Sequence, residues 1–215
     1  MTSPETKPKT TRGRPTRSPE QIEDMRLRIS MCALKLFQAE GYTAVSMRRL
    51  AKEVGCTVMT LYKYYNRKID ILRELWKLIF KELFEEIEAI TKSETDEIAR
   101  LKAICKFYVN YWLNSRDRYF LVFMSSGVSQ EDVSIFVGDD ALLARFDILR
   151  QSLSGALEGS ISEPDLTIKS QLLLCMLNGI AHNLITINAY PWTQPDQLIN
   201  EAINGLLRPD CRESL

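Results

Sequence analysis

The fold is decided by residues 46–65, which read SMRRLAKEVGCTVMTLYKYY. Ser46 is a good helix N-cap, and Gly55 is typical of the residue that ends a helix in the left-handed conformation. One residue then intervenes before Thr57, which can cap a second, very short helix through Tyr62. Two short helices joined by a tight glycine-containing turn are the helix-turn-helix pattern. The apolar residues on one face of the first helix are Leu50, Ala51 and Val54.

A longer helix is predicted on each side of this pair. Before it, Ser18-Pro19-Glu20-Gln21 combines an N-cap, a proline at the first helical position and a capping box, and Gly41 is predicted to end the helix. After it, Asn66 is predicted to cap a helix that continues to Ile90, roughly 37 Å long at 1.5 Å per residue. The sequence therefore predicts a three-helix head and a long fourth helix. The apolar positions at helical spacing are Ile22, Met25, Ile29, Cys32, Ala33, Leu36 and Phe37 in the first, and Ile69, Leu72, Trp76, Ile79, Leu83, Ile87 and Ile90 in the fourth.

The net charge of zero divides into two opposite halves. Residues 1–78 carry 16 Lys and Arg against 8 Asp and Glu, whereas residues 79–215 carry 12 against 20. A basic N-terminal third on an acidic remainder indicates a nucleic-acid-binding head, with a chance gradient along a solvated surface as the alternative.

The first 17 residues are a basic arm with almost nothing to bury, so we expect them to be disordered on their own. Within the arm, Arg12-Gly13-Arg14-Pro15 resembles the core of an AT-hook. Gly and Pro keep such a segment extended, and Arg12 and Arg14 could then enter a narrow minor groove. The alternative is a tail that touches phosphates without sequence preference.

Composition excludes several classes of protein. With 215 residues, 45% hydrophobic and 26% charged, the chain resembles an ordinary soluble protein that can bury its own core. The longest uncharged apolar stretch, Leu172 to Ile187, is too short to span a bilayer, and no secretory signal is visible. Five cysteines without CxxC spacing argue against a zinc ribbon or a disulfide scaffold, so we expect a cytoplasmic protein.

The remainder of the chain is predicted to be a helical body. No alternation typical of strands persists, so the expected fold class is all-α, with a helix-turn-helix domain followed by a helical bundle and about nine helices. The expected division is an arm over residues 1–17, a helix-turn-helix domain over 18–66 and a helical domain over 67–215. The expected body helices span about 95–114, 118–125, 139–159, 164–189 and 194–207, with Asp139 or Asp140 capping the third and Thr193 the last, and residues 125–138 are expected to be a loop with one helical turn.

The exact residues of the head are more specific evidence than the helix-turn-helix pattern alone. Gly41-Tyr42-Thr43, Ser46 to Ala51, Val54-Gly55 and Leu61 to Lys68 together resemble the DNA-binding head of the tetracycline-repressor (TetR) family over about residues 20–75. Met59 departs from the small residue usual in that family. The resemblance implies a homodimeric transcription regulator whose helical body binds a small-molecule effector.

Residue roles in the head follow from chemistry and from this resemblance. The short helix should enter the major groove, where Val58 and Met59 could contact thymine methyl groups or, alternatively, pack inward. Arg48 is the candidate for bidentate guanine recognition, with a solvated arginine as the alternative. The other expected contacts to bases or phosphates are Ser46, Thr57, Thr60, Tyr62, Lys63, Tyr64 and Lys68, of which Lys68 matches the family's phosphate-contacting lysine. The residues expected to form the core of the head are Phe37, Leu50, Ala51, Val54, Leu61 and Tyr65.

Two further sets of residues are expected in the body. The last two helices carry wide apolar faces, and the resemblance implies that they pair with a second copy, a monomeric bundle being the alternative. The expected interface residues are Leu173, Met176, Leu177, Leu198, Ala202 and Leu206. Aromatic side chains concentrated in the body could line an effector cavity or form plain core. The expected pocket residues are Tyr108, Tyr111, Trp112, Phe120, Phe123, Met124, Phe146 and His182.

These observations favour a homodimeric, sequence-specific DNA-binding regulator, a repressor released from a palindromic operator by a hydrophobic or aromatic small molecule. A helical-bundle enzyme is the first alternative, but the single histidine leaves no metal or nucleophile–base constellation, so no cofactor, metal or catalytic residue is expected. A basic-arm interaction protein without sequence-specific binding is the second.

Overall fold

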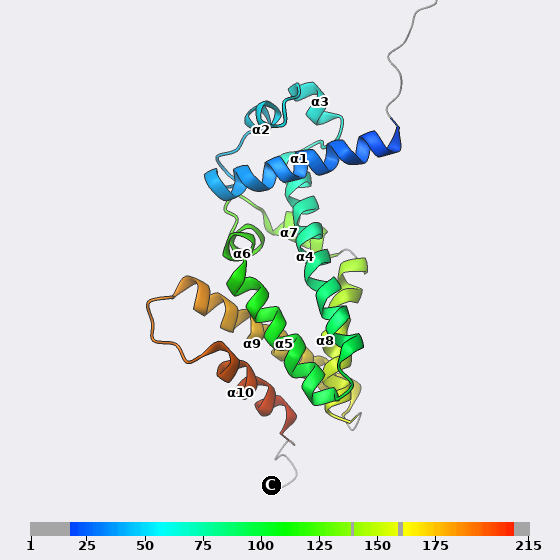
Figure 1. Cartoon of the computed structure of the whole chain (residues 1–215), viewed down its shortest axis with the longest axis vertical. Coiled ribbons are helices and arrows are strands. Elements are labelled where there is room, and N and C mark those ends of the chain that lie inside the picture. Colours follow the sequence, from blue (N-terminus) through cyan, green and yellow to red (C-terminus); the bar gives the residue numbers. More distant parts are fainter. Residues whose placement is uncertain (1–17, 139, 159–160, 209–215) are drawn as a thin grey trace, which may run out of the picture.

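A computed structural model of the chain describes residues 18–138, 140–158 and 161–208. Over these residues the fold is all-α, as the sequence predicted, and ten helices follow one another with a head at one end and the C-terminal helices at the other (Figure 1). No described helix combines the length and the apolar character that a bilayer span requires. The helices are α1 Pro19–Glu40, α2 Met47–Val54, α3 Val58–Tyr62, α4 Lys68–Ser93, α5 Glu97–Asn114, α6 Arg116–Phe123, α7 Gln130–Val137, α8 Asp140–Ala156, α9 Glu163–Thr186 and α10 Pro195–Leu207.

The three helices of the head begin and end where the local signals predicted. Ser18 and Gln21 form the capping box of α1, and Gly41 ends that helix with a positive φ of 81°. Gly55 ends α2 in the left-handed conformation, at φ 74° and ψ 36°. A glycine is needed there because a side chain in this conformation is strained.

The start of the fourth helix differs from the prediction. Asn66 was expected as the N-cap, but Arg67 holds that position and Lys68 is the first helical residue. The reason lies three residues further on, where the Asp70 carboxylate accepts a hydrogen bond from the Arg67 backbone N–H at 2.9 Å. This contact fixes the helix start one residue later than the Asn side chain alone would suggest.

In the body, the helices agree with the expected ones but their ends differ. The segment expected to be mostly loop contains α7, whose eight residues are capped by Ser129, and this helix brings the number above the expected nine. Residue 139, one of the two expected caps of α8, lies outside the described residues. The last helix begins after Gln194 and not at the predicted cap Thr193, because Pro195 occupies its first position.

The long helix α4 connects the head to the body. Its 26 residues extend about 39 Å, packing against α1 at one end and against α5 and α8 at the other (Figure 1). Helix α5 lies at the centre of the body, in contact with α4, α6, α8, α9 and α10. Helix α4 therefore joins the head to the body helices that surround α5.

Candidate nucleic-acid interface

The α2–turn–α3 unit is held by its caps and by a small apolar core. The Ser46 hydroxyl accepts a hydrogen bond from the Arg49 N–H, and the Thr57 hydroxyl accepts one from the Thr60 N–H, both at 3.1 Å. The predicted core of the head is confirmed: each of its members is at most 5% exposed. These residues are Phe37, Leu50, Ala51, Val54, Leu61 and Tyr65.

Helix α3 presents a distinct outer face. Met59 is 73% exposed and Tyr62 is 45% exposed, although both are large and apolar, and Lys63 is exposed beside them. Val58 and Tyr64, in contrast, are half-buried and pack against the core of the head. Much of the surface of these two side chains is not covered by the head, so this face is available for a partner.

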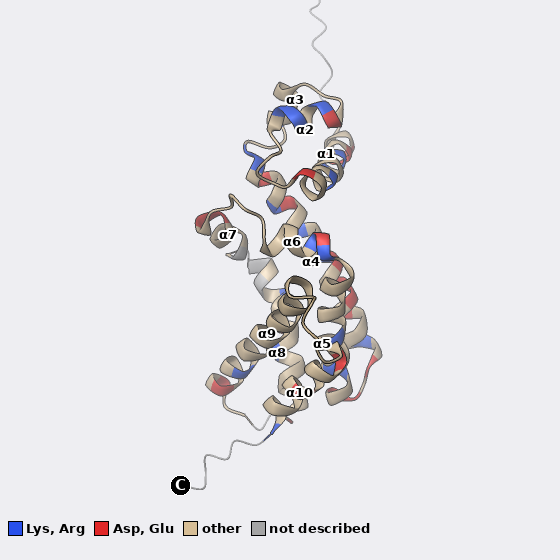
Figure 2. Ribbon diagram, turned by 90° about the vertical axis from the view of Figure 1, so that its left-hand side faces the viewer, with Lys and Arg blue, Asp and Glu red and all other residues tan. Residues whose placement is uncertain are grey.

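Two neighbouring arginines of α2 differ in their surroundings. Arg49 is paired on both sides, with Glu53 at 2.8 Å and Glu40 at 2.9 Å. Arg48 is exposed, and no ion pair or hydrogen bond joins it to another described residue. Arg48 is thus the α2 guanidinium that remains available for a ligand. Figure 2 shows the Lys and Arg positions of the head in blue, at the opposite end of the molecule from α10.

Lys68 is engaged within the head. Its ammonium donates to the carbonyl oxygens of Tyr42 at 2.6 Å, Val45 at 2.9 Å and Thr43 at 3.3 Å, and it lies 4.2 Å from the centre of the Tyr42 ring. Burial lowers the pKa of Lys68, whereas the carbonyl oxygens favour its charged form. The side chain expected to contact phosphate therefore first stabilises the turn between α1 and α2.

The same turn contacts the body. The Thr43 hydroxyl lies 2.9 Å from both the carbonyl and the hydroxyl oxygen of Ser126, in the segment between α6 and α7. A Cβ atom added to Gly127 would lie 3.1 Å from the Thr43 hydroxyl, so the two segments are closely apposed. Beside them, a cleft of about 270 Å³ separates α6 from the end of α1. It is lined by Phe37, Gln38, Gly41, Tyr42, Asp117, Phe120, Leu121, Met124, Ser125 and Ser126.

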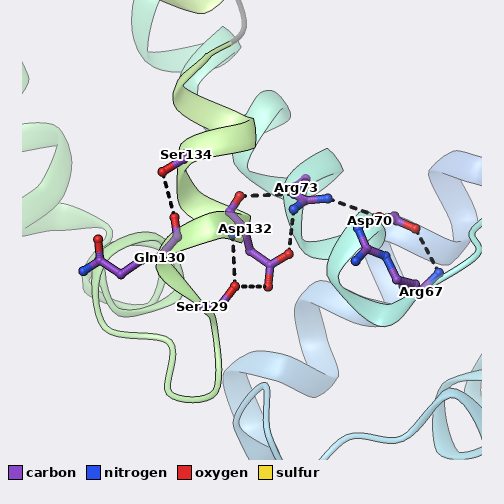
Figure 3. A network of polar contacts seen from close by, with 7 residues as sticks. All are labelled: Arg67, Asp70, Arg73, Ser129, Gln130, Asp132 and Ser134. Carbon is purple, nitrogen blue, oxygen red and sulfur yellow. Dashed lines mark hydrogen bonds and ion pairs between the residues drawn. The ribbon is translucent and has the colours of Figure 1, made fainter.

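An ion-pair network joins α7 to α4 close to the head (Figure 3). The Arg73 guanidinium pairs with Asp132 at 2.7 Å and with Asp70 at 3.4 Å, and the Asp70 carboxylate also holds the start of α4. Hydrogen bonds to Ser129, with Arg73 contributing less, lower the pKa of the Asp132 carboxyl. The arginine and Asp132 are mostly buried, so this contact ties α7 firmly to α4.

The residues predicted to line an effector pocket fall into two groups. Phe120 and Met124 line the cleft between α1 and α6. Tyr108, Tyr111 and Trp112 are buried in an aromatic cluster between α5 and its neighbours. The remaining three belong to the same cluster: Phe123 packs on Trp112, Phe146 on Phe84, and His182 is hydrogen-bonded to Tyr119.

The structure corrects part of the expected dimer interface. Leu173 and Leu177 are 0% exposed and Leu206 is 5% exposed, because these faces of α9 and α10 pack into the chain's own core. Periodicity alone does not tell which side of an all-apolar helix faces inward. The other expected residues line a surface groove of about 350 Å³ between α9 and α10. Its lining is Met176, Gly179, Ile180, Asn183, Leu184, Trp192, Leu198 and Ala202.

Sequence reasoning missed the contact at the start of α4 and the contacts that α7 and the segment before it make with α4 and with the head. Asp70 carries a recognisable signal, since an acidic residue three positions after a helix cap is typical of a capping box. The Thr43–Ser126 and Arg73–Asp132 pairs join residues 83 and 59 positions apart. No local pattern predicts such pairs, because they depend on how α6 and α7 return to the head.

A small helix-turn-helix head with an exposed short helix, carried on a larger helical body, defines the class of helix-turn-helix DNA-binding regulators. A sequence profile of the bacterial regulatory proteins of the tetR family matches residues 32–75. The HTH-type transcriptional regulator SAB2452 of Staphylococcus aureus (strain bovine RF122 / ET3-1) is 32% identical over 145 residues, which cover 60% of this chain and 77% of the relative. The chain therefore belongs to the TetR family of transcriptional regulators.

Solved structures agree with this fold. The fatty acid degradation regulator FadR from Bacillus halodurans superposes with a TM-score of 0.68 at 18% identity, over 92% of this chain and 99% of that one. The transcriptional regulator FadR from Bacillus subtilis, solved in complex with stearoyl-CoA, gives a TM-score of 0.68 at 18% identity over 84% and 97%. At this identity the likeness concerns the fold alone.

Proposed function

We propose that the protein is a homodimeric repressor that binds a palindromic operator through two copies of α3 and leaves it when a small molecule binds the body. The observation that carries the proposal is the outer face of the head. Met59, Tyr62, Lys63 and Arg48 are exposed there, whereas Leu50, Ala51, Val54 and Leu61 form the core of α2 and α3. Ser46 and Thr57 cap the two helices. A regulator of this kind acts on chromosomal DNA, so we expect it in the cytoplasm.

The proposed DNA contacts divide by their surroundings. Arg48 reads a guanine, and Met59 lies against a thymine methyl group, because both are exposed on the same head. Tyr62 and Lys63 contact the phosphate backbone. The remaining candidates cap helices, pack against the core or hold turns within the head. They contribute to DNA binding by keeping α2 and α3 in place or by a second hydrogen bond to phosphate. These residues are Ser46, Thr57, Val58, Thr60, Tyr64 and Lys68. Arg12 and Arg14 of the arm lie outside the described residues and are proposed to reach the adjacent minor groove.

The proposed dimer forms across the groove between α9 and α10. Ile168 and Leu172 on the outer side of α9, and Ile187 directly after the helix, are exposed, which is unfavourable unless a second surface covers them. A Cβ atom added to Gly179, on the same helix, meets nothing within 4 Å. Glycine inside a helix costs about 1 kcal/mol relative to alanine, and close approach of a second helix accounts for its presence.

Effector release is proposed to pass through α6. This helix touches α1 at the cleft, and the segment that follows it holds the head through Thr43 and Ser126. An effector that displaces α6 would alter the position of the head and with it the spacing of the two α3 helices. A difference in affinity of a few kcal/mol between the two states is sufficient.

The test measures binding of the full chain to random and selected duplexes by fluorescence anisotropy at several salt concentrations. The proposal predicts a preference for a palindrome, two chains per duplex and a steep loss of affinity with salt. Gly179→Leu should prevent dimer formation in sedimentation and weaken operator binding, while Glu201→Ala, on the exposed side of α10, should do neither. Equal affinity for all duplexes, or for single-stranded RNA, would instead support an interaction protein without sequence-specific DNA binding.

A further inference from the structure

One polar atom in the centre of the body lacks a hydrogen-bond partner. Trp112 is 0% exposed, and its indole N–H donates to no atom of the described residues. The Tyr108 hydroxyl interacts with it, but the two do not reach hydrogen-bond geometry. A buried donor without an acceptor is costly and rare in folded proteins, so this N–H calls for a physical explanation. The rings around the indole are Phe80, Tyr108, Tyr111, Tyr119 and Phe123, with centroids at 5.1–6.3 Å.

The neighbouring polar groups do not share this deficit. The Tyr108 hydroxyl donates to Asn178 Oδ1 at 2.7 Å, and the Tyr119 hydroxyl lies 2.9 Å from His182 Nδ1. The nearby Trp76 indole N–H donates to the Leu121 carbonyl at 3.1 Å. The fold thus provides acceptors for comparable donors in the same cluster. Among the described residues, the Trp112 N–H is the buried side-chain donor that no acceptor meets in hydrogen-bond geometry.

The cover over Trp112 is exposed to solvent. The Phe123 ring packs at 5.1 Å from the indole and at 4.8 Å from the Tyr119 ring, yet Phe123 is 41% exposed. It is the last residue of α6, a helix of only eight residues whose start has no side-chain cap. Phe123 is therefore a solvent-exposed ring in direct contact with the indole, at the end of a short helix.

The surroundings of the indole favour an uncharged ligand. The nearest guanidinium described at this cluster, that of Arg118, is hydrogen-bonded to Tyr111 and paired with Glu82. The other described groups around the indole are aromatic rings, an amide and an imidazole. An ionised head group would lose its hydration here without gaining an unpaired opposite charge.

We propose that the effector is an uncharged, mainly apolar molecule whose single hydrogen-bond acceptor, such as a ketone or ester carbonyl, binds the Trp112 indole N–H beneath Phe123. The inference rests on the proposed function, since it names the class of effector. It differs from what a charged acyl-CoA, the ligand in the FadR complex, would require. Entry beneath Phe123 would also displace α6, the helix that contacts the head.

The experiment compares three naphthalenes of similar shape as probes of the full-length protein. These are 2-acetylnaphthalene, which offers a neutral acceptor, 2-ethylnaphthalene, which offers none, and 2-naphthoate, which is an anion. Calorimetry should give the ketone about tenfold tighter binding than the hydrocarbon, the value of one hydrogen bond, and weaker binding for the anion. With 15N-tryptophan, the three indole N–H resonances can be assigned by replacing each tryptophan with phenylalanine. Only the Trp112 resonance should shift downfield, and only with the ketone.

Trp112→Phe keeps an aromatic ring and removes the N–H, so it should abolish the preference for the ketone over the hydrocarbon. Trp76→Phe, in the same cluster, should preserve that preference. If Trp112→Phe fails to fold, the shift of the Trp112 indole resonance of the unsubstituted protein on addition of the ketone decides. Equal affinity of ketone and hydrocarbon, preference for the anion, no binding of any probe or an unmoved Trp112 resonance would each overturn the inference. Binding of the ketone at Trp112 without release of operator DNA would uphold the site and contradict the proposed effector mechanism instead.

Discussion

Arg48 and Arg49 are neighbours in α2 with different surroundings, so replacing each with alanine separates base recognition from stability. Arg48 has no described partner, whereas Arg49 pairs with Glu40 and Glu53. Arg48→Ala should therefore change which bases the protein prefers and leave the free energy of unfolding nearly unchanged. Arg49→Ala should lower the free energy of unfolding and leave the base preference unchanged.

The magnitudes follow from these contacts. A bidentate arginine–guanine contact contributes about 1–3 kcal/mol of discrimination, so losing it should reduce the preference for guanine roughly 5- to 150-fold in each half-site. The two ion pairs of Arg49 involve side chains that are 37–46% exposed. Exposed pairs of this kind contribute little to stability because solvent screens them, so Arg49→Ala should lower the free energy of unfolding only slightly, with no change in base preference.

The assay is a competition between an operator and duplexes in which each half-site position carries each of the four bases in turn. It is carried out for the Arg48→Ala and Arg49→Ala proteins at one salt concentration. Urea unfolding of the same samples gives the stability. If Arg48→Ala weakens all duplexes by a common factor, this arginine contacts phosphate or nothing, and our assignment of base recognition is wrong. A changed base preference in Arg49→Ala would contradict it equally.

Three further perturbations test other parts of the account. Lys68→Met should lower the midpoint of thermal unfolding, because three carbonyl oxygens lose a charged donor, and should reduce the affinity for all duplexes by a similar factor. Lys63→Met, the control, should reduce the affinity for DNA without lowering that midpoint. Asp132→Asn should destabilise the protein at neutral pH. The pKa of Asp132 is lowered in the folded state. The ionised carboxylate therefore stabilises the fold above its unfolded pKa of about 3.9, and this contribution is lost as pH falls through the folded pKa. The unfolding free energies of the unchanged protein and of Asp132→Asn should converge below about pH 4. Deletion of residues 1–17 should reduce affinity most for A·T-flanked operators, and an equal loss for all flanks would support a non-specific tail.

The head could be predicted from the sequence because its determinants are local. Ser46, Gly55 and Thr57 each act within four residues of their own position, through caps and turns. The predicted Asn66 cap is wrong because the Asp70 carboxylate accepts a hydrogen bond from the Arg67 N–H, which makes Arg67 the cap.

The body could be predicted only in outline. Aromatic residues at helical spacing look the same in sequence whether they line a cavity or pack together, and Tyr108 and Trp112 are buried in the cluster while Phe120 borders a cleft. An apolar helix such as α9 likewise gives no sign that Leu173 faces inward and Leu172 outward. These outcomes depend on packing between helices distant in sequence.

The central claim is that two heads, each presenting α3, read one duplex together. Selection of bound sequences from random duplex DNA by the full chain tests this claim most directly. The account predicts a palindromic consensus whose half-site centres lie about 34–36 Å apart, or a multiple of that distance. A single asymmetric site, or no enriched sequence at all, would contradict it.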